Sequence, residues 1–259
     1  MARSIRRIRS NTVANVSGVW TQGMAEAFAS LGLDLPSLCV DAALDVAALT
    51  DPRGRLPRDW AGRLWRAALQ RSDDPFLGLH AAEVWEPRTN HLVWLLFLTA
   101  ETFGRGLEAA VHYQSLLARG QVVTLGREGE HLLVQVNRVA DKLPITDNQI
   151  EYLAGVLVRL FRFSTDGLFR LEQVRFEHPY RGEIEHYEAL FGCPAVFDCE
   201  RTELVVGEEV WGLPLAHGNR SLHGQLTQMA ETEYSGLDTL GFAAAAKDAI
   251  RALLSKGQY

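Results

Sequence analysis

The period of the hydrophobic pattern first changes near residue 120 of this chain of 259 residues. Before that point apolar residues recur at helical spacing, as Trp60, Leu64 and Ala68 do. After it come short β-rich runs separated by turn residues, such as 122–125 and 131–136, which are typical of a hairpin. Helices and strands that occupy separate parts of a chain bury their apolar faces by packing against one another in layers. The order therefore predicts an α+β fold, with a helical N-terminal part followed by a mostly antiparallel sheet flanked by helices.

Further local signals follow the change of period. Thr146 and Gln149 have the spacing of a capping box and predict a helix that starts there. Later segments are expected to form a strand, a helix, a second hairpin and two final helices: 171–176, 182–190, 195–199 with 203–206, 220–233 and 237–254. We accordingly divide the chain into four parts: a flexible basic terminus, a helical subdomain, a sheet subdomain and terminal linker helices, at 1–14, 15–120, 121–216 and 217–259.

Composition excludes some classes of protein. The net charge of −6 disfavours a free-standing nucleic-acid-binding unit, which normally carries a basic face. Four arginines crowd into the first ten residues and form either a solvated terminus or a phosphate-contacting arm. The three cysteines are irregularly spaced, which favours a reducing, cytoplasmic environment over a disulfide framework. No apolar run approaches the ~20 residues that cross a bilayer, so we expect no membrane association.

Motifs that would carry chemistry are missing from the sequence. There is no nucleophile elbow, no phosphate-binding loop and no zinc-protease motif. His178, His186, Cys193 and Cys199 match no standard zinc module in their spacing. We therefore predict no catalytic residues, no metal site and no cofactor, and we do not expect an enzyme.

Aromatic residues gather in the sequence around a predicted helix break. Two interpretations remain open for them: packing in the core, or the wall of an apolar pocket between the helices and the sheet. Polar side chains near the same place are candidates for orienting a ligand. The candidate ligand-binding residues are Trp85, Trp94, Phe97, Phe103, His112, Tyr113, Gln135 and Arg175.

Several blocks of sequence together resemble a known family. They run in one order along nearly the whole chain: Leu31 to Asp34, Leu49 to Pro57, Asp73 to Leu79, Thr102 to Gly104, Val174 to Pro179 and Leu190 to Gly192. In this order they are similar to the N-terminal sensor half of AraC/XylS-type transcription regulators, the half with the arabinose-binding-domain type of sensor. The family name does not imply arabinose as the effector.

The resemblance implies a one-component cytoplasmic regulator. Its sensor half is expected to bind a small-molecule effector and to form a homodimer. Promoter DNA would be bound by a C-terminal helix-turn-helix half, which is expected where this chain ends. The apolar stripe Leu222, Leu226 and Met229 is a candidate dimerisation surface, and intramolecular packing is the alternative for the same stripe.

The sequence is compatible with two other functions. A haem- or gas-sensing domain is one, because His112 lies on a helix that leads into a hairpin and Tyr113-Gln-Ser115 begins a haem-binding pattern. Leu117, however, stands where that pattern needs arginine, and a lone helical histidine is a weak sign of an axial ligand. The other is an enzyme that acts on the same kind of small molecule, although no nucleophile–base pair can be argued from spacing.

Overall fold

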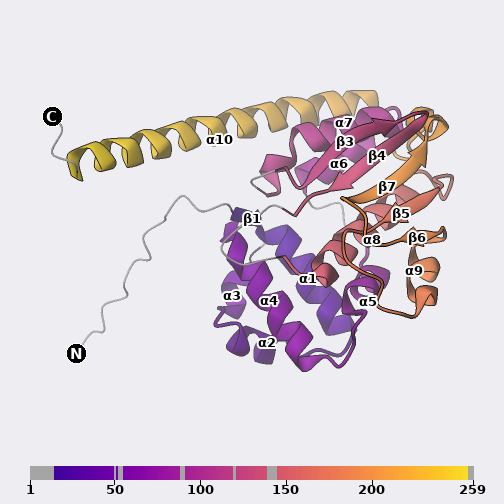
Figure 1. Ribbon diagram of the computed structural model, residues 1–259. Coiled ribbons are helices and arrows are strands. Elements are labelled where there is room, and N and C mark those ends of the chain that lie inside the picture. Colours follow the sequence, from indigo (N-terminus) through magenta and orange to yellow (C-terminus); the bar gives the residue numbers. More distant parts are fainter. Residues whose placement is uncertain are drawn as a thin grey trace.

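The computed structural model of the chain describes residues 15–49, 51, 55–87, 91–118, 121–138 and 145–255 (Figure 1). The expected basic terminus, 1–14, lies outside the described residues. The helices are α1 (Gly18–Ser30), α2 (Leu35–Asp41), α3 (Val46–Leu49), α4 (Arg58–Arg71), α5 (Leu77–Val84), α6 (Leu92–Thr99), α7 (Phe103–His112), α8 (Asp147–Ser164), α9 (Ile184–Phe191) and α10 (Arg220–Ser255), with short 3₁₀ helices η1 (Gln114–Leu116) and η2 (Glu208–Gly212). The strands are β1 (Asn15–Ser17), β2 (Arg55–Pro57), β3 (Val123–Glu128), β4 (His131–Val136), β5 (Gln173–Arg175), β6 (Ala195–Val196) and β7 (Thr202–Gly207).

The α+β prediction is confirmed. Helices α1 to α7 come first, and a five-stranded sheet in the order β3-β4-β7-β5-β6 follows (Figure 1). The pairs β3–β4, β4–β7 and β5–β7 are antiparallel, and only β5–β6 is parallel. The expected hairpin of β3 and β4 turns at Gly129, which has the positive φ of 61° that such a tight turn favours.

The second expected hairpin, between 195–199 and 203–206, is wrong. Strand β7 inserts between β4 and β5, while β6 pairs with β5 at the edge of the sheet formed by the described strands. All six residues of β7 are buried, as expected of a strand that has a neighbour on each side within the sheet. The two-residue β6 suits an edge.

Helix α8 connects the two halves of the fold. The predicted capping box is present: the Thr146 hydroxyl accepts a hydrogen bond from the Gln149 amide nitrogen, and the Gln149 side chain accepts one from Thr146 N. The helix contacts both α5 and β4, so one hydrophobic core extends across the helical part and the sheet.

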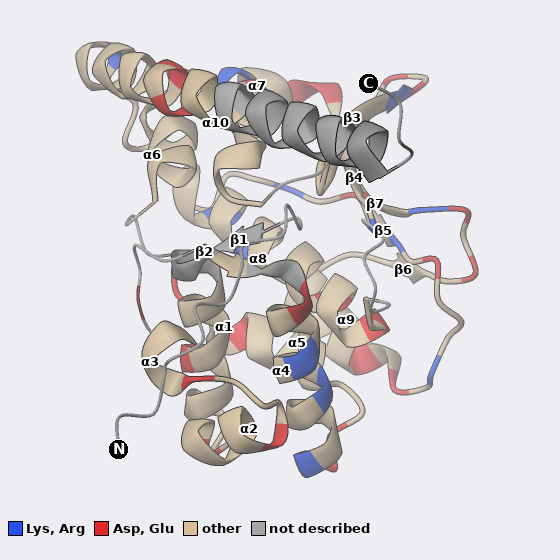
Figure 2. Ribbon diagram, turned by 90° about the vertical axis from the view of Figure 1, so that its left-hand side faces the viewer, with Lys and Arg blue, Asp and Glu red and all other residues tan. Residues whose placement is uncertain are grey.

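The C-terminal helix α10 runs without interruption from Arg220 to Ser255, so the prediction of two separate helices is wrong. Gly236 lies at the expected break, but a glycine inside a helix costs only about 1 kcal/mol relative to alanine. Figures 1 and 2 place the start of α10 beside α6 and α7, on the side of the molecule opposite α2 and α3. Within the described part of the chain, no helix combines the length and the apolar character needed to cross a bilayer.

Candidate ligand-binding site

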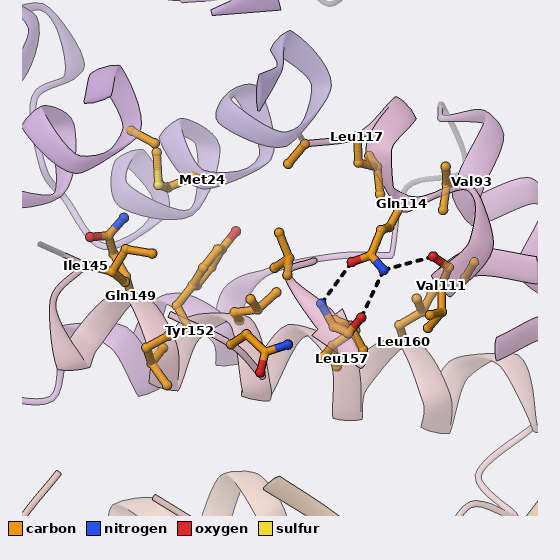
Figure 3. Close-up of a pocket in the computed structure, with 18 of the residues that line it drawn as sticks. Met24, Val93, Val111, Gln114, Leu117, Ile145, Gln149, Tyr152, Leu157 and Leu160 are labelled. Atoms are coloured by element: carbon orange, nitrogen blue, oxygen red, sulfur yellow. Dashed lines mark hydrogen bonds between the residues drawn. The ribbon is translucent and has the colours of Figure 1, made fainter. Parts of the chain in front are cut away.

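A cavity of about 150 Å³ lies between the helical part and α8 (Figure 3). Its wall is built by α4, α6, α7, η1, β3 and α8, with Met24 of α1 closing one end. The lining residues are Met24, Asp59, Ala61, Gly62, Trp65, Val93, Trp94, Phe97, Leu107, Ala110, Val111, Gln114, Leu117, Ala118, Val122, Val123, Asn137, Ile145, Gln149, Ile150, Tyr152, Leu153, Leu157, Leu160 and Phe161.

Helix α8 supplies one whole side of this cavity. Its lining residues Ile150, Leu153, Leu157 and Leu160 recur every three or four positions, which places them on one face of the helix. Across from them, Trp65 of α4 packs edge-on against Phe28, with ring centroids 4.8 Å apart, and so belongs to the core as well as to the wall. The wall is therefore apolar on both sides and is held by the surrounding core.

Gln114 closes the wall between η1 and β3. Its Nε2 donates to the carbonyl oxygens of Val111 at 2.8 Å and Val123 at 2.9 Å, and its Oε1 accepts from Val123 N at 2.9 Å (Figure 3). Both hydrogens of the amide are thus used by the backbone. Gln114 consequently fixes the position of η1 against the hairpin rather than offering a free donor to the cavity.

Three other polar side chains that line the cavity are Asn137, Asp59 and Tyr152. The first donates hydrogen bonds, the second forms an ion pair, and the third stays uncharged. Asn137 donates through Nδ2 to Gln121 O and Thr124 Oγ1, each at 3.0 Å. Asp59 forms an ion pair with Arg63 at 3.7 Å, and its side chain is 38% exposed. Burial raises the pKa of the Tyr152 phenol well above its usual value, so this side chain stays neutral.

Two of the residues predicted from sequence, Trp94 and Phe97, line the cavity. Phe103 lies directly behind them, with its ring centroid 5.7 Å from that of Phe97, and is fully buried in the core. Trp85 is also buried, and its carbonyl oxygen accepts a hydrogen bond from Arg159 at 2.9 Å. Phe103 and Trp85 are not among the lining residues.

The two candidates that follow in the sequence face α10 instead. The Tyr113 hydroxyl donates to the carboxylate of Glu231 at 2.6 Å, and burial together with this carboxylate raises the pKa of Tyr113 to about 12. The ring of His112 stacks on Tyr234 with centroids 5.4 Å apart. Both side chains therefore connect the end of α7 to α10.

Gln135 and Arg175, the predicted polar groups of the sheet, meet on its other face. Val134 and Val136 point into the core, so Gln135 between them points away from it. Gln135 donates to Glu203 at 2.9 Å, and Arg175 contacts Glu203 at 3.3 Å and Glu128 at 2.8 Å. These groups form a polar network outside the cavity.

A buried ionic cluster lies on the opposite side of α8. The Glu151 carboxylate, fully buried, accepts a hydrogen bond from the Tyr187 hydroxyl at 2.6 Å, contacts His178 Nε2 at 3.2 Å and pairs with Arg181. Burial alone would raise the pKa of Glu151, but the His178 contact and the charge of Arg181 outweigh it and lower the pKa. The cluster joins α8 to α9.

No group of three or more side chains suited to hold a metal occurs among the described residues.

Sequence reasoning missed the contribution of α8 and of Gln114. The helical period marked the apolar face of α8, but the same pattern arises whether a face packs against solid core or borders a cavity. Gln114 gave no local signal, because its partners Val111 and Val123 come together only when η1 meets the hairpin.

The family model of the arabinose-binding domain of AraC transcription regulators, N-terminal part, matches residues 32–215. No curated protein sequence matches the chain. Among solved structures, the crystal structure of the transcriptional regulator CdpR from Pseudomonas aeruginosa is similar, with a TM-score of 0.59 and 16% sequence identity. The likeness covers 84% of this chain and 62% of that chain, and at this identity it concerns the fold alone.

The expected resemblance is thus confirmed by a family match and by a shared fold. The matched region begins after α1 and ends before α10, so it contains nearly all of the elements that build the cavity. The chain belongs to the family of arabinose-binding domains of AraC transcription regulators.

Proposed function

We propose that this chain is the effector-sensing and dimerising part of a one-component cytoplasmic transcription regulator. A small-molecule effector would occupy the cavity, and a helix-turn-helix domain of the full-length regulator would bind promoter DNA. The observation that carries the proposal is that the cavity and the first turns of α10 share one wall, formed by α6, α7 and η1.

The two sides of this wall are made by neighbouring residues. Val111 and Gln114 line the cavity, whereas Tyr113 and Leu116 belong to a second hydrophobic cluster that includes α10; Leu117 lines the cavity and also packs against that cluster. Val93 belongs to both sets, and the other members of the second cluster are Leu96, Leu226 and Ala230. An occupant that displaces the wall therefore also displaces the surface on which α10 rests.

Hydrogen bonds fix α10 to the same wall. Asn219 N donates to Thr99 O at 2.8 Å, the Thr99 hydroxyl lies 3.3 Å from His223 Nδ1, and Tyr113 is bonded to Glu231. These contacts attach α10 at the end of α6 and at the end of α7. An effector that binds one placement of this wall better than another shifts the population of α10 placements.

Dimerisation is proposed to use the exposed side of α10. Leu226 is only 7% exposed and packs within its own chain, whereas Leu222 and Met229 are 41% and 54% exposed. Within the predicted stripe, Leu222 and Met229 thus remain available to a second copy. Met229→Glu is expected to convert a dimer into a monomer in light scattering, while Gln228→Glu on the neighbouring exposed position should leave the dimer intact.

Native mass spectrometry of the purified chain tests the sensing function. We expect a dimer that releases a small molecule of defined mass at rising collision energy. Leu157→Trp, which fills the cavity from α8 at a distance from α10, should retain the dimer and lose the small molecule. A chain that carries no small molecule and takes none up from a metabolite extract would contradict the proposal.

A further inference from the structure

We propose that the effector is a neutral, mainly apolar molecule about the size of one aromatic ring, with one hydrogen-bond acceptor that Gln149 binds. This inference rests on the proposed function, because it assigns the chemistry of the occupant of the same cavity. It depends on three properties of the lining: its charges, its free donors and its volume.

The described part of the lining offers no cationic partner for an anion. Within the described residues, Asp59 is the lining residue that carries a charge, and it is negative and partly exposed. Among the described residues, two basic side chains near the cavity are held by other groups: Arg63 donates to Ala42 O and Ala43 O at 3.3 Å and pairs with Asp59, and Arg138 pairs with Asp147 and Glu177. Since burying an ion without a partner is strongly unfavourable, the described wall disfavours a carboxylate or phosphate ligand.

Gln149 provides a donor that the described lining leaves free. Its Oε1 accepts from Thr146 N at 3.2 Å as part of the capping box, which fixes the orientation of the amide. Its Nε2 has no hydrogen-bond partner among the described residues, whereas the amide hydrogens of Gln114 and Asn137 are taken by backbone and hydroxyl oxygens. The free donor favours an acceptor such as a carbonyl, an ether or a hydroxyl oxygen on the ligand.

The donor lies at one end of the cavity. Figure 3 shows Gln149 beside Ile145 and toward Met24, while Gln114 and Val111 lie at the other end. Leu157 and Leu160 of α8 continue the lining from Gln149 toward Gln114. A bound molecule is therefore expected to place its acceptor at the Gln149 end and its apolar body along the leucines.

The volume sets the size of the molecule. Dry apolar cavities of about 150 Å³ in proteins bind molecules the size of benzene. The cavity here has that volume and is lined largely by apolar side chains. A single substituted ring or a short branched chain fits within this volume, whereas a long lipid chain would have to extend out of the partly open cavity or displace its wall.

Three probes of similar size separate these properties by isothermal titration of the whole chain: acetophenone, ethylbenzene and benzoate. Acetophenone has the ring and an acceptor, ethylbenzene lacks the acceptor, and benzoate carries a negative charge. We expect acetophenone to bind tightest, ethylbenzene about fivefold more weakly because it lacks one hydrogen bond, and benzoate at least about tenfold more weakly. Benzoate binding as tightly as acetophenone would overturn the assignment of a neutral ligand.

The substitution Gln149→Glu replaces the donor with a carboxylate oxygen that cannot donate and that also adds a negative charge. Glutamate keeps the side-chain oxygen that accepts from Thr146 N, and glutamate is itself favoured at this position of a capping box, so the start of α8 should be preserved. We expect acetophenone to lose about fivefold in affinity and ethylbenzene to change less than twofold. An equal loss for both probes would overturn the role of Gln149, and the ranking of probes on the unmodified chain tests the ligand class independently.

Leu157→Trp distinguishes failure of this inference from failure of the proposed function. It should abolish binding of all three probes by filling the cavity. If benzoate binds best but Leu157→Trp removes that binding, the cavity is a ligand site and only the assigned ligand class is wrong. If no probe binds the unmodified chain, or if Leu157→Trp leaves binding unchanged, the cavity is not the sensing site and both conclusions fail.

Discussion

The two sides of α8 differ in how tightly they are packed. On the side of α5, a Cβ atom added at Gly78 would lie 2.2 Å from Asn148 O, and one at Gly155 would lie 2.6 Å from the Ala82 side chain. On the other side, Leu153 and Leu157 border a cavity of about 150 Å³. One helix thus combines a contact that leaves no room for a methyl group with a wall that leaves room for a ligand.

This difference indicates a division of roles. The side of α8 that faces α5 and α9 stabilises the fold through close backbone contacts and the Glu151 cluster. The side that faces the cavity is packed less completely, and η1 connects it to α10. A site that binds a small molecule needs a rigid support on which the residues of its wall are held. We therefore expect substitutions on the two sides to have effects that differ in kind as well as in size.

The largest effect on stability is expected from Gly78→Ala. The added methyl would collide with the backbone of Asn148, which cannot rotate away as a side chain would, and Gly78 N also donates to Asn148 Oδ1 at 2.8 Å. We expect a loss of about 3 kcal/mol in the free energy of unfolding, measured by urea denaturation. Gly224→Ala in the exposed part of α10, where a Cβ meets nothing within 4 Å, should instead stabilise by about 1 kcal/mol.

Glu151→Gln should cost about 2 kcal/mol near neutral pH, because it leaves Arg181 and His178 beside an uncharged amide. The pKa of Glu151 is lowered in the folded protein, so its contribution is present above the ordinary value of 4.5 and is lost as the pH falls through the folded value. The unmodified chain should therefore lose more stability between neutral and acidic pH than the variant does. This account would be contradicted if the free energies of unfolding of the two proteins fell equally with decreasing pH.

Local signals in the sequence were sufficient for the α+β class, the first hairpin and the capping box, since each depends on residues close in the chain. The position of β7 was not predictable in the same way, because its partners β4 and β5 are distant in sequence. The orientation of Gln135 follows from local pattern: Val134 and Val136 face the core, so the alternation of a strand places Gln135 on the other face.

The cavity itself was only partly predictable. Trp94 and Phe97 belong to an aromatic cluster that sequence can identify, and both line the cavity. Tyr113 belongs to the same cluster in sequence but faces α10, because η1 turns the chain between α7 and β3. Such turns decide which residue of an aromatic cluster borders a cavity. Hydrophobic periodicity in the sequence does not indicate where these turns point the chain.

Tyr113→Phe tests the connection between the cavity wall and α10. It removes the hydrogen bond to Glu231 while keeping the ring against His112 and Tyr234. We expect about 1 kcal/mol less protection from hydrogen exchange in residues 226–237, with little change in α8. Tyr180→Phe, at a side chain 51% exposed, serves as the matched control and should leave both regions unchanged.

The smallest effect on stability, and the sharpest contrast with Gly78→Ala, is expected from Ala61→Leu. Ala61 of α4 lines the cavity, so added methyl groups have space to occupy and gain contacts without displacing backbone. We expect the free energy of unfolding to change by less than about 1 kcal/mol, while ethylbenzene binding measured by titration falls by at least about tenfold because the space is filled. A loss of stability comparable to that of Gly78→Ala would mean that the cavity side of α8 is packed as tightly as the α5 side, and the division of roles between the two sides would then be wrong.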